Sequence, residues 1–191
     1  MVGGVSLLTT QRMALMISLV AIAGCASSGQ QAPTPHSNQP YRGQDSRDIR
    51  ALSASEVDDY LAGSGMGFAR AAELNHYPGP LHTLQLADRL ELSDEQRRAI
   101  ESLMAAHRTE ARTAGARVIE TERALDAVFR LSVIPDPTLL STRVEAAARA
   151  QGDFRLTHLE THRRMRSMLT DAQVARYDTL RGYGSGAAHS H

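Results

Sequence analysis

The chain has 191 residues, a formal net charge of zero, 42% hydrophobic residues and only 4% aromatic residues. This length leaves room for one domain with tails, and the balanced charge excludes a global field that would recruit nucleic acid or an anionic membrane surface. Ala, Leu and Met make up much of the hydrophobic fraction. Because these residues favour helices, we expect an all-α fold.

Residues 1–24 are expected to be a bacterial lipoprotein signal peptide. Arg12 precedes the apolar run MALMISLVAIAG, which is too short for a permanent membrane span and is typical of a secretory signal. The run ends at Cys25, the only cysteine, and the string Ile22-Ala23-Gly24-Cys25 resembles a lipobox. This resemblance implies cleavage before Cys25, lipidation of Cys25 and, with Ala26 next, sorting to an outer membrane. The alternative is an ordinary signal peptide whose cysteine is incidental.

A disordered tether is expected next, over residues 25–54. The stretch from Ser27 to about Arg50 is rich in Gln, Ser, Pro and Gly. Such a composition cannot bury enough apolar surface to offset its ordering entropy. A flexible chain of about 25 residues spans roughly 25–30 Å, enough to hold a domain away from a lipid surface.

A helical domain is expected over residues 55–183, and its first elements are short. Helix-start patterns alternate there with breaks that contain Gly and Pro. The predicted helices are Ser55–Leu61, which Gly63 ends; Phe68–Leu74; and Leu81 to about Leu90, with Pro80 as a first helical residue.

The same five-residue pattern starts two further helices, as LSDEQ at positions 92–96 and as LTDAQ at positions 169–173. In each copy the hydroxyl residue can accept a hydrogen bond from the first helical turn. The Gln three residues later can reach back to the N–H of the capping residue, which completes a capping box. The predicted capping residues are Ser93, Gln96, Thr170 and Gln173.

Two long helices are predicted between these motifs. The first runs from about Asp94 to Leu131, and the second carries its seam from Leu140 to Met168. In both, seam positions recur at spacings of four and three, as in helices that pack on one another. The short connection Ser132–Asp136 predicts an antiparallel hairpin. A last helix is predicted to end at Gly182, and residues 184–191, which include two histidines, are expected to form a flexible tail.

A secreted all-α chain with a long antiparallel hairpin between two such boxes resembles the Spy/CpxP family of bacterial periplasmic proteins. Relatives of this family are described as heavy-metal-resistance proteins or metal sensors. The phrases that carry the resemblance are AAELNHYPGPLHTLQLADRLELSDEQ and HLETHRRMRSMLTDAQVARYDTLRGY, and the first box has Ser93 where the family pattern has Thr. The resemblance implies short helices folded back over the hairpin, and often an intertwined homodimer. It also implies ATP-independent holding of unfolded envelope proteins.

Arg155, Arg163 and Arg166 are the candidate client-binding residues. They lie on the second hairpin helix, where basic residues outnumber acidic ones between positions 143 and 166. A basic arm beside Met and Leu is suited to hold anionic, partly unfolded chains. The alternative is a solvated helix face whose arginines pair with neighbouring carboxylates.

A transition-metal site is predicted on the hairpin from His107, His158 and His162, with Met165 as a further ligand. His158 and His162 share one helix face, and the antiparallel register places His107 across from His162 to within about one turn. Imidazole suits Zn, Ni, Co or Cu(II), whereas Met favours Cu(I). The alternative is that these histidines make local hydrogen bonds and the Met fills the core. Weaker candidates are His76, His82, His189 and His191.

No enzymatic activity is expected. The string HLETH differs from the zincin motif HExxH because Glu160 points away from the histidine pair. The hypothesis is a membrane-tethered periplasmic stress protein of a Gram-negative bacterium that binds a transition metal, holds unfolded clients, or does both. No organic cofactor and no nucleic acid partner are expected. The alternative is a dedicated metal sensor or buffer that signals to a membrane regulator and has no chaperone activity.

Overall fold

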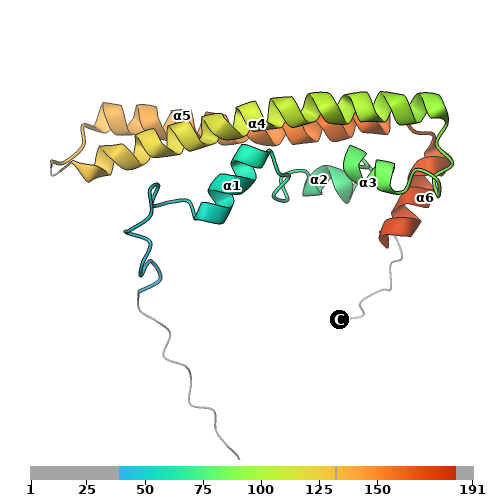
Figure 1. Ribbon diagram of the computed structural model, residues 1–191. Helices are drawn as coiled ribbons and strands as arrows, with labels where there is room; N and C mark the ends of the chain where they lie inside the picture. The colour runs from blue at the N-terminus through green and yellow to red at the C-terminus, as the bar shows by residue number, and fades with distance from the viewer. Residues whose placement is uncertain (1–38, 132, 184–191) are drawn as a thin grey trace, which may run out of the picture. The chain divides into compact units, whose positions relative to one another are not determined.

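The computed structural model describes residues 39–131 and 133–183, and this part of the chain is all-α, which confirms the expected fold class (Figure 1). Cys25, the expected signal peptide and the tail at 184–191 lie outside the described residues. Within them, no helix is long and apolar enough to cross a membrane. The helices are α1 (Ala54–Ala62), α2 (Arg70–Glu73), α3 (Pro80–Gln85), α4 (Asp94–Arg130), α5 (Pro137–Arg166) and α6 (Asp171–Arg181).

The long helices α4 and α5 pack antiparallel along one another, as the seams predict (Figure 1). α4 has 37 residues and α5 has 30. Asp136 caps α5 by accepting a 2.9 Å hydrogen bond from the backbone N–H of Leu139, and Pro137 is the first helical residue. This local chemistry ends the turn and starts the returning helix.

Both predicted capping boxes are present. Ser93 caps α4 and Thr170 caps α6, and in each case the Gln at the third helical position accepts from the backbone N–H of the cap. A third box caps α1, where Ser53 is bonded to Glu56. The helix therefore begins at Ala54, one residue before the predicted Ser55.

The two predicted boxes also contact each other. The amide Nε2 of Gln96 donates to Gln173 Oε1 at 2.9 Å, and Nε2 of Gln173 donates back to Gln96 Oε1 at 3.1 Å. The same two amides donate to the backbone carbonyls of Met168 and Leu90. The start of α4 is thereby fixed against the start of α6.

Two hydrophobic clusters hold the short helices against the hairpin. One lies near the α6 end and includes Leu90, Ile100, Met165 and Tyr177. The other packs α1 and the preceding turns on the middle of the hairpin, and Tyr60, Val118 and Phe154 belong to it. The ring of Tyr60 lies edge-on to that of Phe154, with centroids 5.0 Å apart.

The disordered tether is predicted to extend to residue 54, but residues before this position already pack against the helical domain. Ile49 is 1% exposed and Leu52 is 8% exposed, and both belong to the cluster around Tyr60. The compact unit begins at Tyr41 rather than at residue 55. Ile49 and Leu52 are isolated apolar residues in a polar stretch, so they form no helical or strand periodicity, yet both are buried in that cluster.

The third short helix is also shorter than predicted, since α3 ends at Gln85 and not near Leu90. Ala87, Leu90 and Leu92 are all buried in one cluster, and Leu86 packs against it. Leu92 would lie about 200° round a straight helix from Leu90, so the chain turns before Leu92 to bury both. Glu91 takes a left-handed conformation, with φ of 53°, in this turn.

Candidate functional site

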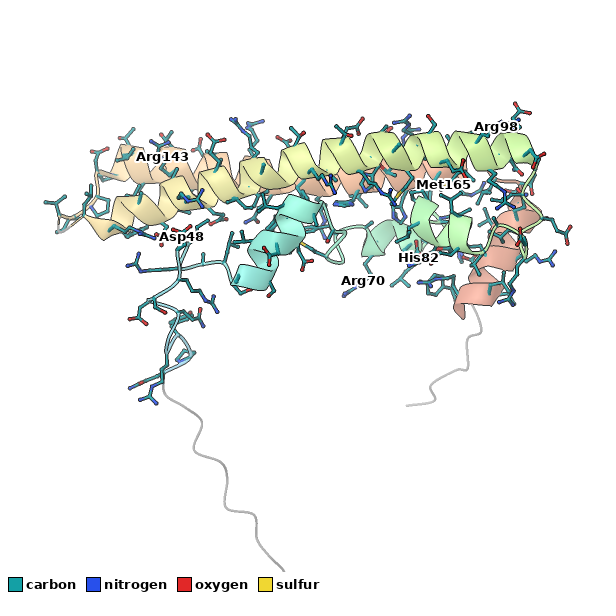
Figure 2. The ribbon with its side chains drawn as sticks, in the orientation of Figure 1. Asp48, Arg70, His82, Arg98, Arg143 and Met165 are labelled. Atoms are coloured by element: carbon teal, nitrogen blue, oxygen red, sulfur yellow. The ribbon has the colours of Figure 1, made fainter. Side chains whose placement is uncertain are left out.

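A cavity of about 640 Å³ lies between the hairpin and a covering segment, which we define as residues 62–85 and which contains α2 and α3. Figure 2 marks the covering segment with Arg70 and His82. The hairpin side of the cavity is lined by residues of α4 and α5, among them all three predicted metal-ligating histidines. These hairpin residues are Met104, His107, Arg108, His158 and His162.

His158 occupies the most enclosed part of this histidine group. It is 4% exposed, and its ring lies edge-on to the ring of His107 with centroids 4.7 Å apart. Burial, and then the neighbouring His107 and His162, lower the pKa of His158 to about 4. The ring is therefore neutral at neutral pH. Its Nε2 atom is buried and has no hydrogen-bond partner in the described residues.

The tautomer of His107 follows from its neighbour Thr161. The hydroxyl of Thr161 donates its single proton to the carbonyl oxygen of Thr157 at 2.9 Å. The same oxygen lies 3.0 Å from His107 Nδ1, so it accepts from that nitrogen. Burial also lowers the pKa of His107. The neutral ring thus carries its proton on Nδ1 and its lone pair on Nε2.

His162 is held in the same way by a backbone carbonyl. Its Nδ1 lies 2.8 Å from the carbonyl oxygen of Tyr77, which can only accept. Nδ1 is also 3.5 Å from Glu73 Oε2. A side chain at Gly79 would meet the His162 ring, since a Cβ there would lie 2.9 Å from Cε1. Gly79 therefore leaves the space that this ring fills.

The structure brings the three histidines together, although His107 contacts His158 and Thr161 rather than His162. The predicted register is correct to within one turn. In the described residues, no group of three or more His, Cys, Asp or Glu side chains has an arrangement that could hold a metal ion as it stands. Met165 is fully buried in a hydrophobic cluster and does not line the cavity, which favours the core-filling interpretation for this residue.

The weaker histidine candidates lie in different places. His82 lines the cavity, and burial lowers its pKa. His76 has a left-handed backbone, with φ of 68°, and its Nδ1 lies 2.7 Å from Asp178 Oδ2. His189 and His191 lie outside the described residues.

The three candidate client-binding arginines all have partners. Arg155 donates to the carbonyl of Phe68 and lies over its ring, 5.7 Å from the centroid. Arg163 makes two hydrogen bonds, of 2.7 and 2.6 Å, to the carboxylate of Glu160. Arg166 pairs with Asp171. This geometry corresponds to the alternative of a helix face whose arginines are paired.

Glu73 joins several elements around the cavity, and no pattern in the sequence predicts this role. Its Oε1 accepts hydrogen bonds from the hydroxyls of Tyr177 at 2.5 Å and Tyr183 at 3.2 Å, and its Oε2 accepts from the backbone N–H of Gly79 at 3.1 Å. Burial and this bond raise the pKa of Tyr177. Arg181 Nε lies 3.8 Å from the same carboxylate. Glu73 lies in a helix of four residues, where no periodicity distinguishes it.

Comparison with known proteins finds no protein-family model, no curated protein and no solved structure that matches this chain.

Proposed function

We propose that the protein binds a transition-metal ion through His107, His158 and His162 and acts, without enzymatic activity, in metal or envelope stress in the periplasm. The observation that carries this proposal is the convergence of the three imidazoles on one cavity. Neutral imidazoles are suitable ligands for Zn, Ni, Co and Cu(II). The resemblance to the Spy/CpxP family supports the compartment and the stress role.

The hydrogen bonds of the rings support this choice of ligands. A metal-ligating histidine usually donates its other N–H to a carbonyl, a carboxylate or a similar acceptor. His107 donates from Nδ1 to Thr161, and His162 donates from Nδ1 to Tyr77. Because His158 is neutral at neutral pH, an ion has no proton to displace from it.

The present arrangement fits a responsive site better than a permanent structural one. Two imidazoles can bind first, and the third joins only if a ring turns out of the edge-on contact between His107 and His158. That contact is part of the hairpin packing, so binding competes with it. The site is therefore expected to load when metal is abundant, as a resistance or sensing role requires.

Calorimetric titration of the full chain with Zn, Ni, Co and Cu(II) tests the proposal. The double variant His158→Ala/His162→Ala should lose most of the affinity for at least one metal. His76→Ala, a histidine that does not line the cavity, is the control and should bind like the parent. His189→Ala/His191→Ala measures any contribution of the tail. Equal affinity in the parent and the cavity variant, for every metal, would refute the proposal.

Holding of unfolded clients is the second candidate function. The observation that favours it is a set of large apolar side chains exposed at the hairpin turn. Contiguous exposed apolar surface marks interaction sites in soluble proteins. The exposed residues at this turn are Phe129, Leu131, Val133 and Ile134.

An aggregation-suppression assay, with and without metal, tests client holding. Val133→Ser/Ile134→Ser should weaken suppression if the turn holds clients. If the basic arm holds clients, Arg155→Ser/Arg163→Ser/Arg166→Ser should weaken the suppression of aggregation and reduce its dependence on salt. No suppression by the parent would leave the alternative of a dedicated metal sensor or buffer.

We also propose a lipid anchor at Cys25 in the outer membrane and a homodimer. The anchor rests on the lipobox-like string, and Cys25→Ala should abolish membrane fractionation. The dimer is supported by Val144, which follows Leu140 by four residues in the predicted seam of the second hairpin helix and is nevertheless 48% exposed. Sedimentation as a monomer at micromolar concentration would contradict the dimer.

A further inference from the structure

The cavity has the size and lining of a small-molecule site. Its volume of about 640 Å³ falls within the range of about 300–1,000 Å³ that is usual for such sites. Apolar side chains come from both the covering segment and the hairpin. They include Met66, Leu74, Leu81 and Met104.

The charged groups that line the cavity are mostly cationic. Glu73 is the carboxylate among them, and it already accepts hydrogen bonds from Tyr177, Tyr183 and Gly79. Arg181 is engaged with the hydroxyl and ring of Tyr183. The histidines His107 and His158 have lowered pKa values and are neutral at neutral pH.

Two guanidinium groups at the cavity remain available. Arg70, on α2, and Arg108, on α4, both line the cavity and are exposed. Within the described residues, neither side chain has an ion-pair or hydrogen-bond partner. Figure 2 shows Arg70 on the covering segment. The two groups thus add positive charge, one from the covering segment and one from the hairpin, to a largely apolar lining.

We infer that this cavity binds a small amphipathic organic anion, with its carboxylate at Arg70 and Arg108 and its apolar body against Met66, Leu74, Leu81 and Met104. Guanidinium groups bind carboxylates through paired, charge-assisted hydrogen bonds. A neutral ligand of the same shape lacks this interaction, and an amphipathic cation is repelled. The inference does not rest on metal binding, because it uses neither the histidine lone pairs nor an ion.

Calorimetric titration of the full chain in buffer with chelator tests this inference. The probes are decanoate, decanol and decyltrimethylammonium, each below its micellar concentration. Decanoate should bind with one molecule per chain and at least about tenfold more tightly than decanol, since hydrogen bonds to charged groups are the stronger class. The cation should bind least. Equal affinity for decanoate and decanol, or no binding of decanoate, overturns the inference.

Matched variants locate the binding. Arg70→Gln/Arg108→Gln should weaken decanoate binding about tenfold and leave decanol binding unchanged. Arg98→Gln is the control, because Arg98 is exposed on α4 but does not line the cavity. An equal loss in the control shows a general charge effect and overturns the inference.

A blocking variant separates the cavity from the apolar hairpin turn. Ala69 lines the cavity and is half-buried, so Ala69→Trp should fill part of it. The variant should lose binding of both decanoate and decanol while its circular dichroism spectrum stays that of the parent. Binding that survives in a folded Ala69→Trp protein places the ligand elsewhere and overturns the inference.

Discussion

At the residue scale, His158 makes folding sensitive to acid. Its pKa is lowered from 6.5 to about 4 in the folded chain by burial and by the two neighbouring histidines. Between these pH values the unfolded chain binds a proton that the folded chain does not. The free energy of unfolding therefore rises with pH through this window and levels off above about pH 6.5. For one group the full effect is on the order of 3 kcal/mol.

We expect the parent to lose about 2–3 kcal/mol of unfolding free energy between pH 7 and pH 4.5 through this group. Replacing it by an uncharged ring, as in His158→Phe, should remove most of that pH dependence. Urea unfolding in buffer with chelator measures both proteins at each pH. An identical loss in parent and variant would show that other groups cause the acid sensitivity.

The pair Gln96 and Gln173 supplies a second prediction at this scale. In Gln96→Glu the carboxylate can still accept from Ser93, because Glu serves a capping box as well as Gln does. It can no longer donate to Gln173 and Met168, and its charge faces an oxygen acceptor. Unfolding free energy should fall by about 1–3 kcal/mol.

The control for Gln96→Glu is the reverse change in the third capping box. Glu56 makes its hydrogen bonds to Ser53 within its own helix turn. Glu56→Gln should therefore change unfolding free energy by less than about 1 kcal/mol. Equal effects of the two variants in urea unfolding would show that the contact between boxes adds nothing beyond capping.

At the element scale, local chemistry explains what could be predicted from the sequence. Caps such as Ser93 and Gly182 act within one turn of their own helix, so their residue types identify them. The antiparallel register of the two long helices predicted His107 across from His162 to within about one turn, and the observed contacts of His107 with His158 and Thr161 lie within that range. The contacts of Glu73 with distant tyrosines depend on how the covering segment lies, and no periodic pattern in its sequence encodes that.

The crossing of α1 over α4 depends on a glycine. A Cβ at Gly115 would lie 1.9 Å from the carbonyl oxygen of Tyr60. Ala is normally the better helix former by about 1 kcal/mol. In Gly115→Ala, however, α1 must move away from α4, and we expect a net loss of about 2–3 kcal/mol of unfolding free energy, as for other steric overpacking.

Gly152 on α5 is the matched control for Gly115. Nothing lies within 4 Å of a Cβ at Gly152, so Gly152→Ala should keep the propensity gain and stabilise the chain by up to about 1 kcal/mol. Urea unfolding of both variants gives the comparison. If both substitutions stabilise the protein, the close crossing of α1 and α4 does not persist in solution.

At the scale of the whole compact unit, Glu73 connects the short elements to one another. Its carboxylate accepts from Tyr177 on α6, from Tyr183 beyond it and from Gly79 before α3, while His162 of α5 lies 3.5 Å away. These groups come from segments that lie far apart in the sequence. The hairpin itself is held by its own seam and does not depend on this carboxylate.

Glu73→Gln is therefore expected to loosen the covering segment and leave the hairpin intact. The amide keeps an acceptor oxygen but loses the charge and places an N–H₂ group where an acceptor is needed, so unfolding free energy should fall by about 1–3 kcal/mol. Amide hydrogen exchange should rise in α2, α3 and α6 before it rises in α4 and α5. Glu91→Gln breaks an exposed ion pair with Arg176 and, as the control, should change stability by less than about 1 kcal/mol. Exchange that rises equally in all helices of the Glu73 variant would mean that the unit opens as a whole, and that no separate covering segment exists.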